Sequence, residues 1–258
     1  MRLTSLFACS AAILFSASIP AFSQTSTTAP AKPKTSTTTT HTTSPYDRAL
    51  LKPSLLKETA PATYQVKFVT TRGDFTLTVT RAWAPLGADR FYNLVKHHYF
   101  DGARVFRVVP GFVAQFGLSA YPPVTAAWSN AKIKDDPHSQ SNKRGTITFA
   151  TSGPNTRTTQ LFINFKDNSN LDSQGFTPFG VVDGNGMNIV EMFYDQYGDS
   201  AGMDQEAIEK GGEKYIAERW PKLDAIKSAT IVGGTSSTTA APKPAAAAKP
   251  APAPATKP

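Results

Sequence analysis

In the central stretch of the chain, residues 62–233, apolar and polar residues alternate over many short segments. Alternation with a period of two is typical of β-strands that bury one face. Residues 64–70 and 75–79 are the clearest examples, and the Arg72-Gly73 pair between them predicts a hairpin turn. Further predicted strands cover residues 104–109, 112–116, 146–151, 160–165, 179–183 and 225–232. Many short strands separated by Gly, Pro, Asn and Asp favour a closed or sandwiched antiparallel sheet.

Two helices are expected to interrupt these strands. The first covers residues 85–95, which carry apolar residues at helical spacing and a proline in the first turn, where proline is tolerated. The second covers residues 188–194. A third segment, residues 205–220, has a partly helical pattern that Gly211-Gly212 interrupts and Pro221 ends.

The chain divides into four parts by composition. Residues 1–23 combine a basic start, a short apolar stretch and a small-x-small cleavage site, which predicts a secretory signal peptide. Residues 24–61 predict a disordered Thr/Ser/Pro-rich linker and an N-terminal extension whose leucines pack on the domain. Residues 62–233 form the folded domain, and residues 234–258 a disordered Ala/Pro/Lys-rich tail. We therefore expect a periplasmic or secreted protein.

No segment of the sequence is expected to span a membrane. The apolar stretch of the signal peptide is too short for a typical membrane-spanning helix, and no other segment is apolar enough. Cys9 lies within that signal peptide, so the mature chain is expected to contain neither disulfides nor reactive thiols.

The charge of the chain is concentrated at its ends. The formal net charge is +8, yet residues 62–233 hold 18 Lys and Arg against 17 Asp and Glu, which leaves nine basic and two acidic residues elsewhere. A nucleic-acid-binding domain should carry its own basic face, so we expect no nucleic-acid partner. The basic ends either contact an anionic envelope surface or keep the chain soluble, and we favour the second interpretation.

The common signatures of nucleophilic, metal and nucleotide chemistry are missing from the sequence. It contains no GxSxG, HExxH, P-loop, GxGxxG after a strand, or CxxC motif. His97 and His98 adjoin the end of a predicted helix, and a surface or capping role suits them better than a metal site. We therefore expect neither a cofactor nor a metal ion.

Four blocks of sequence stand out instead. They are R-V-V-P-G-F-V-A-Q-F-G at 107–117, F-A-T-S-G-P-N-T at 149–156 with Q-L-F-I at 160–163, L-D at 171–172 with F-G at 179–180, and G-M-N-I-V-E at 186–191. In this order and at these separations they resemble the cyclophilin family, in an exported, bacterial-like form. The resemblance covers residues 62–233 and implies a mainly β fold. That fold is a closed eight-stranded antiparallel β-barrel capped by two helices, with the active site on its outer face.

The resemblance also implies an activity, peptidyl-prolyl cis/trans isomerisation, and a set of site residues. Arg107 takes the position of the catalytic arginine, and Gln115 that of the glutamine that orients it. Phe112 matches an aromatic residue that floors the proline pocket. The substrate-binding residues implied in the same way are Val113, Ala150, Thr151, Gln160, Phe162, Leu171 and Phe176.

This residue set fits the physical demands of the reaction. Resonance gives a peptide bond a rotation barrier of about 18–20 kcal/mol. The two isomers of an X–Pro bond differ by only about 1 kcal/mol, so a catalyst is useful there. An apolar pocket can hold the proline ring while the preceding residue rotates. A fixed guanidinium can then donate a hydrogen bond that is stronger in the twisted transition state than in the ground state. The expected partners are proline-containing polypeptides.

Several positions depart from the family pattern. Val105 and Phe106 replace an aromatic-His pair, and Leu118 is one of two large apolar residues that flank Gly117. Asn170 stands where many members have a tryptophan that contacts cyclosporin, so weak or no cyclosporin binding is expected. The segment from residue 199 to residue 220, called the insertion below, is not part of the minimal family pattern, and the sequence assigns it no role.

Three interpretations remain open at this stage. The favoured one is an enzyme that isomerises X–Pro bonds in exported clients and so assists their folding. A second is a module or chaperone that holds proline segments without turnover, although an intact Arg107 argues for catalysis. A third is a structural protein of the cell envelope that functions through its tails. We expect a monomer, and a Pro-rich tail could also visit the pocket of its own chain.

Overall fold

The computed structural model describes residues 44–235. The expected signal peptide, the linker up to residue 43 and the tail from residue 236 lie outside the described residues. The strands are β1 (Thr63–Thr70), β2 (Asp74–Thr80), β3 (Arg107–Val109), β4 (Val113–Phe116), β5 (Thr146–Phe149), β6 (Leu161–Asn164), β7 (Pro178–Val182) and β8 (Ile226–Thr235). The α-helices are α1 (Pro85–Lys96), α2 (Pro122–Trp128), α3 (Met187–Val190), α4 (Ser200–Met203) and α5 (Gln205–Arg219). Short 3-10 helices are η1 (Arg48–Leu51), η2 (Pro53–Leu55), η3 (Arg81–Trp83), η4 (Ser169–Gln174) and η5 (Gly184–Gly186).

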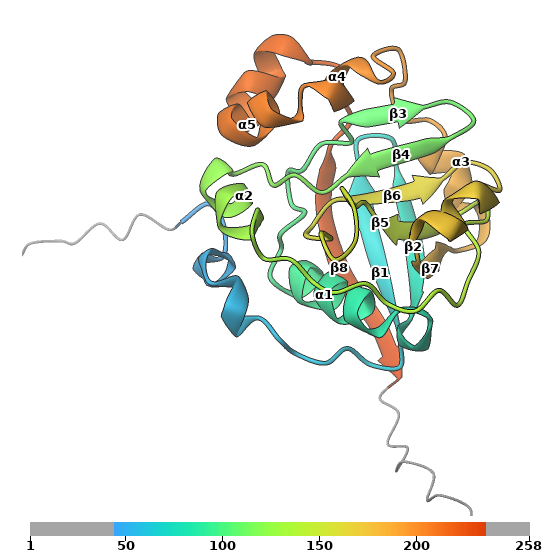
Figure 1. Cartoon of the computed structure of the whole chain (residues 1–258). Coiled ribbons are helices and arrows are strands. Elements are labelled where there is room, and N and C mark those ends of the chain that lie inside the picture. The colour runs from blue at the N-terminus through green and yellow to red at the C-terminus, as the bar shows by residue number, and fades with distance from the viewer. Residues whose placement is uncertain (1–43, 236–258) are drawn as a thin grey trace, which may run out of the picture. The chain divides into compact units, whose positions relative to one another are not determined.

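All the predicted strands are present and form one antiparallel sheet, in the order β3-β4-β6-β5-β7-β2-β1-β8. The mainly β architecture is the expected one, but the prediction of a closed barrel is wrong. The edge strands β3 and β8 do not pair along their lengths, because β3 has only three residues and β8 forms its ladder with β1. A single bridge, between Arg104 and Ala225, joins the segments that precede these strands. The sheet is therefore an open, curled half-barrel (Figure 1).

The core fills the concave side of the sheet and is rich in aromatic rings. Helix α1 packs there through Phe91, whose ring centroid lies 6.4 Å from that of Phe68 and 5.2 Å from that of Phe179. The hydroxyl of Tyr64 donates a hydrogen bond of 2.7 Å to the carbonyl oxygen of Ala88, which ties the helix to β1. The alternating residues of the strands thus bury one face against this helix, as their period of two predicts.

The helices differ from the prediction in number and extent. The expected pair corresponds to α1 and to α3, which ends at Val190 rather than at residue 194. Helix α2 was not predicted, because it starts with Pro122-Pro123, a pair that reads as a loop although prolines fit a first turn. Helix α5 is bent at Gly212, where the sequence predicted an interruption. None of the helices in the described part of the chain has the length and apolar character to cross a membrane.

The described part of the N-terminal extension contacts the domain at several points. Leu50 is buried at 1% exposure, and its carbonyl oxygen accepts a hydrogen bond of 2.8 Å from Nε1 of Trp128. Leu55 is 71% exposed and packs on nothing. Leu56 packs against the core, and the backbone N–H of Glu58 donates a hydrogen bond of 3.1 Å to Oδ1 of Asn93 in α1. The extension is therefore attached to both α2 and α1.

Candidate active site

The residues predicted for the site come from four separate stretches of the chain, and the structure brings nine of the ten around one cavity. Its volume is about 200 Å³. The walls come from β3, β4 and β6, the loop after β5, and the region of η4. The lining residues are Arg107, Phe112, Val113, Gln115, Ala150, Thr151, Phe162, Leu171 and Phe176. Gln160 does not line the cavity and is connected to it through Gln115.

Strand alternation explains how β4 serves the cavity and the core at once. Val113 and Gln115 face the cavity, whereas Ala114 and Phe116 pack into the core on the other side of the sheet. Successive side chains of a strand point to opposite faces, so this division follows from position along the strand. All four residues are buried, because both faces of β4 are covered.

The larger part of the cavity is apolar. Val113, Phe162 and Leu171 are only 2%, 5% and 6% exposed and form a small hydrophobic cluster separate from the core. The ring of Phe176 packs edge-on against that of Phe162, with 5.5 Å between centroids. Such walls exclude water and suit a small apolar group such as a proline ring.

Arg107 provides the charge at the other side of the cavity. It lies opposite Gln115 in the β3–β4 ladder, and its Nη1 donates a hydrogen bond of 3.2 Å to Oε1 of Gln115. Nε2 of Gln115 in turn donates to Oε1 of Gln160 at 2.9 Å. The guanidinium carbon lies 5.7 Å from the centre of the Phe112 ring, within the range of a cation–π contact. The guanidinium is therefore fixed beside the apolar walls.

The structure adds a residue that the sequence did not assign. Nε of Arg107 donates a hydrogen bond of 2.5 Å to Oδ1 of Asp199, at the start of the insertion. Gly202, in α4, lies so close that a Cβ there would be 2.7 Å from Cδ of Arg107. No local pattern links positions this far apart in the sequence, so this contact could not be predicted from spacing.

A polar network supports the wall formed by Leu171 and Phe176. Asp172 accepts hydrogen bonds from the hydroxyl of Ser141, at 2.6 Å, and from the side chain of Asn142, at 2.8 Å. The same Asn142 side chain donates to the carbonyl oxygen of Phe176 at 2.8 Å. Partial burial raises the pKa of Asp172, but the hydrogen bonds from Ser141 and Asn142 outweigh it and hold that pKa below its ordinary value.

Each of the two histidines singled out by the sequence lies beside an aspartate. Within residues 44–235, no group of three or more His, Cys, Asp and Glu side chains is arranged to hold a metal ion. His97 is the C-cap residue of α1, and its Nδ1 lies 2.7 Å from Oδ2 of Asp47. His98 lies beside Asp101, with 3.2 Å between Nδ1 and Oδ2.

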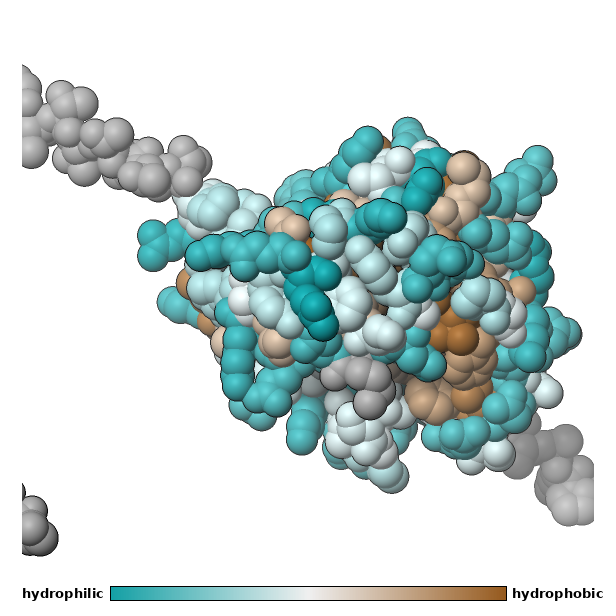
Figure 2. Space-filling model, turned by 90° about the horizontal axis from the view of Figure 1, so that it is seen from above, coloured by the Kyte–Doolittle hydropathy of each residue, from teal (hydrophilic) through white to brown (hydrophobic). Residues whose placement is uncertain are grey.

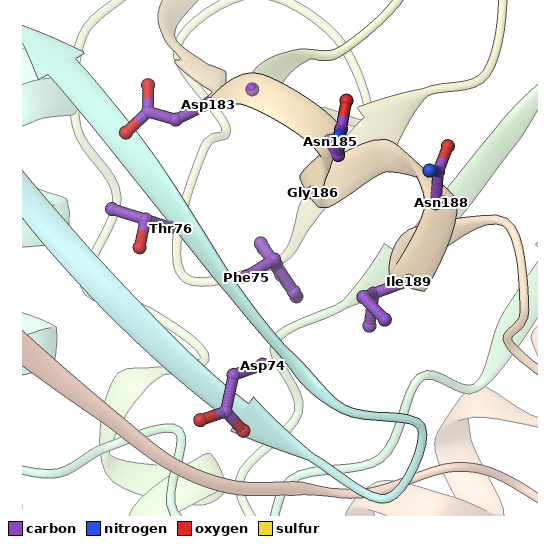
Figure 3. A pocket seen from close by; sticks show the side chains of 9 residues that line it. Asp74, Phe75, Thr76, Asp183, Asn185, Gly186, Asn188 and Ile189 are labelled. Atoms are coloured by element: carbon purple, nitrogen blue, oxygen red, sulfur yellow. The ribbon is translucent and has the colours of Figure 1, made fainter.

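A second hollow, of about 500 Å³, lies at the start of β2 beside η5 and α3 (Figure 3). Phe75 and Ile189 lie next to each other in it, with the carboxylates of Asp74 and Asp183 farther apart. Both carboxylates have partners: Asp74 pairs with Lys67 at 2.8 Å, and Asp183 accepts a hydrogen bond from Thr78. None of the predicted site residues lines this hollow.

Comparisons with known proteins show which family the chain belongs to. Residues 65–211 match the family model described as cyclophilin type peptidyl-prolyl cis-trans isomerase/CLD. The chain is similar to a peptidyl-prolyl cis-trans isomerase of Acinetobacter baylyi, with 31% identity over 182 residues, which are 67% of this chain and 94% of that protein. A peptidyl-prolyl cis-trans isomerase of Helicobacter pylori is 29% identical over 142 residues, 55% of this chain and 84% of that protein.

Among solved structures, one of a Cryptosporidium parvum cyclophilin type peptidyl-prolyl cis-trans isomerase, determined in the presence of the dipeptide Ala-Pro, aligns with a TM-score of 0.48 and 20% identity. The alignment covers 66% of this chain and 99% of that one. The family match extends over more than half of the sequence and includes Arg107 and the other residues that line the cavity. The chain belongs to the cyclophilin-type peptidyl-prolyl cis-trans isomerases and is an enzyme of that class.

Proposed function

We propose that this isomerase is exported and acts as a monomer on X–Pro bonds of other exported proteins, with Arg107 as its electrostatic centre. One observation carries the assignment of the site. The guanidinium of Arg107, held by Gln115, borders an apolar cavity of about 200 Å³, a size that suits a proline ring. The proposal of export, to the periplasm or beyond, rests on the pattern of residues 1–23.

The apolar walls bind the proline ring and hold it still. Phe162 and Leu171 lie deep in the cavity, and Phe112 and Phe176 pack beside them. The residue that precedes the proline rotates outside, near Ala150 and Thr151 at the rim. Because the ring is fixed while the rest of the peptide turns, binding energy favours conformers on the way to the twisted state.

Arg107 stabilises the twisted peptide bond. As rotation breaks resonance, the proline nitrogen regains a lone pair that can accept a hydrogen bond, and a fixed guanidinium can donate one. This donor favours the transition state over either planar isomer, which is the condition for a higher rate. Gln115, which also donates to Gln160, keeps the guanidinium directed at the cavity.

The residue at position 170 also affects the expected affinity for cyclosporin. Asn170 is an exposed residue of η4, directly before Leu171, where a tryptophan would contact the drug. An amide offers neither the area nor the apolar face of an indole. We therefore propose weak or no binding, and a submicromolar dissociation constant by calorimetry would contradict this.

A protease-coupled assay on an Ala-Pro-Phe-type peptide tests the activity and the role of Arg107. We expect Arg107→Ala to lower kcat/KM at least tenfold, about 1.4 kcal/mol of transition-state stabilisation. Arg144→Ala is the control, because Arg144 is 48% exposed and pairs with Glu191 away from the cavity. If the folded parent shows no activity on any X–Pro peptide, the cavity is a proline-binding module.

Cell fractionation with N-terminal sequencing of the recovered protein tests export. We expect the mature chain outside the cytoplasm, beginning at Gln24. A cytoplasmic protein that keeps residues 1–23 would remove this part of the proposal and leave the isomerase activity untouched.

A further inference from the structure

The insertion lies against the strand that carries Arg107. In Figure 1, α4 lies beside β3 at the top of the view, and α5 lies next to α4, above α2. Seen from that side, the surface is mostly hydrophilic, with hydrophobic residues gathered in one area (Figure 2). Helix α4 therefore covers the edge strand next to the cavity, and the exposed residues of α5 include the charged Glu206, Lys210 and Glu218.

A separate hydrophobic cluster holds the insertion in place. Phe106 and Leu118, two of the positions that depart from the family pattern, are 1% and 4% exposed. They pack with residues from the insertion and the turn after it, which are Ala201, Ile208, Ile216, Trp220 and Leu223. The departures thus have a physical reason: these positions provide the apolar surface on which the insertion is seated.

Polar contacts fix the insertion more closely. Asp204 accepts hydrogen bonds from Nε1 of Trp220, at 2.9 Å, and from the hydroxyl of Tyr215. Arg104, which lies shortly before β3, pairs with Glu213 and donates to the carbonyl oxygen of Leu223 at 2.8 Å. Asp204 therefore joins the two ends of the insertion to each other, and Arg104 joins its second half to the domain, so the insertion is a rigid support and not a loose loop.

The start of this support reaches Arg107. Asp199 occupies the N-cap position of α4, yet its side chain caps no backbone N–H of that helix and binds Nε of Arg107 instead. Gly202 leaves room for the aliphatic part of the arginine. Oε1 of Gln115 accepts a hydrogen bond from Nη1 of Arg107. Nη2 donates no hydrogen bond to any residue in the range 44–235, so it remains available to a substrate.

We propose that Asp199 is a positioning residue for Arg107, and that the insertion holds its carboxylate in place. This inference rests on the proposed role of Arg107. With Nε held from one side and Nη1 from the other, the plane of the guanidinium is fixed, and its free donor stays aimed at the cavity. An exposed ion pair adds little to folding stability, so the pair matters for orientation. Asp199 is 59% exposed, which agrees with that view.

Steady-state kinetics of the full chain tests the proposal. We expect Asp199→Ala to lower kcat/KM by roughly fivefold to tenfold, mainly through kcat, because a misdirected donor weakens transition-state contacts more than substrate binding. Asp199→Asn, which keeps an acceptor for Nε, should restore part of the loss. Asp195→Ala is the matched control, since Asp195 lies in the same connection and its side chain accepts a hydrogen bond only from Gln196 among the described residues.

A double substitution separates this proposal from the role of Arg107 itself. In the Arg107→Ala background there is no guanidinium to orient, so Asp199→Ala should change kcat/KM less than about twofold. The proposal is overturned if Asp199→Ala alone stays within twofold of the parent, if Asp195→Ala loses as much, or if the full loss persists in the Arg107→Ala background. If Arg107→Ala itself retains parental activity, the role of Arg107 fails, which is a different result.

Discussion

Arg107 and Arg157 both pair with aspartates, but one pair is at the surface and the other is buried. The side chains of Arg157 and Asp136 are each 2% exposed, with 3.0 Å between Nη2 and Oδ2. Those of Arg107 and Asp199 are 25% and 59% exposed. Breaking a buried pair by removing one partner costs about 3–5 kcal/mol, whereas an exposed pair contributes about 0–1 kcal/mol. The same chemical pair thus holds the fold together in one place and orients a functional group in the other.

The buried aspartate, Asp136, also binds the first turn of α1. The two carboxylate oxygens of Asp136 accept hydrogen bonds of 2.9 Å from the backbone N–H groups of Leu86 and Gly87, in the first turn of α1. A negative charge there also suits the helix dipole. Asp136 therefore ties the start of the core helix to Arg157 in the loop before β6. By contrast, the side chain of Asp199 hydrogen-bonds only Arg107 among residues 44–235 and binds no backbone N–H group.

The strongest test of the contrast is Asp136→Ala. It removes the closer carboxylate of the buried Arg157, which keeps only Asp135 at 3.5 Å, and it uncaps α1. We therefore expect the free energy of unfolding to fall by about 3–5 kcal/mol. Urea denaturation followed by circular dichroism measures the change. The activity per folded molecule should stay close to that of the parent, because neither residue lines the cavity.

The control for this test is Asp74→Ala. Asp74 is 46% exposed and pairs with Lys67, which is 45% exposed, so its loss should cost less than about 1 kcal/mol. If Asp74→Ala destabilised the chain as much as Asp136→Ala, burial would not explain the difference between the two kinds of pair.

The converse substitution is Arg107→Ala. Its kcat/KM should drop at least tenfold, about 1.4 kcal/mol, while the free energy of unfolding changes by less than about 1 kcal/mol. Kinetics and urea denaturation on the same preparation measure both quantities. A large loss of stability would show that Arg107 holds the fold as Arg157 does, and the comparison would break down.

Much of the cavity could be predicted because its residues lie in short local motifs. Arg107, Val113 and Gln115 belong to one hairpin, where strand alternation alone decides which side chains share a face. The strands were likewise visible as alternating segments. The pairing of the edge strands was not visible, since it depends on how far the sheet curls. Only the segments before β3 and β8 meet, in the bridge between Arg104 and Ala225.

What could not be predicted depends on contacts between distant residues. Arg157 reads as a polar loop residue, and only the fold shows that Asp136 and the start of α1 enclose it. Asp199 has no pattern that links it to Arg107. A signal for the insertion did exist, because Phe106 and Leu118 are large and apolar next to the motif, but the partner that covers them could not be read from spacing.

Asp172 extends the comparison. Its side chain is partly exposed like that of Arg107, but it stabilises the structure as Arg157 does. Its side chain is 20% exposed, yet its hydrogen bonds with Ser141 and Asn142 hold the wall at Phe176. Asp172→Asn keeps an acceptor but loses the charge, so we expect a loss of about 1 kcal/mol at pH 7. If exposure alone decided the role of a charged group, this substitution would leave the stability unchanged.

The pH dependence gives this prediction its sign. The pKa of Asp172 is lowered from 3.8 in the folded chain, so folding favours the charged form. Its contribution is complete above that ordinary pKa and is lost as the pH falls through the lower, folded pKa. The melting temperatures of the parent and Asp172→Asn should therefore differ at pH 7 and converge as the pH falls below 3.8. A difference that persists unchanged in acid would assign the effect to the shape of the amide, and the charge of Asp172 would then have no part in holding the cavity wall.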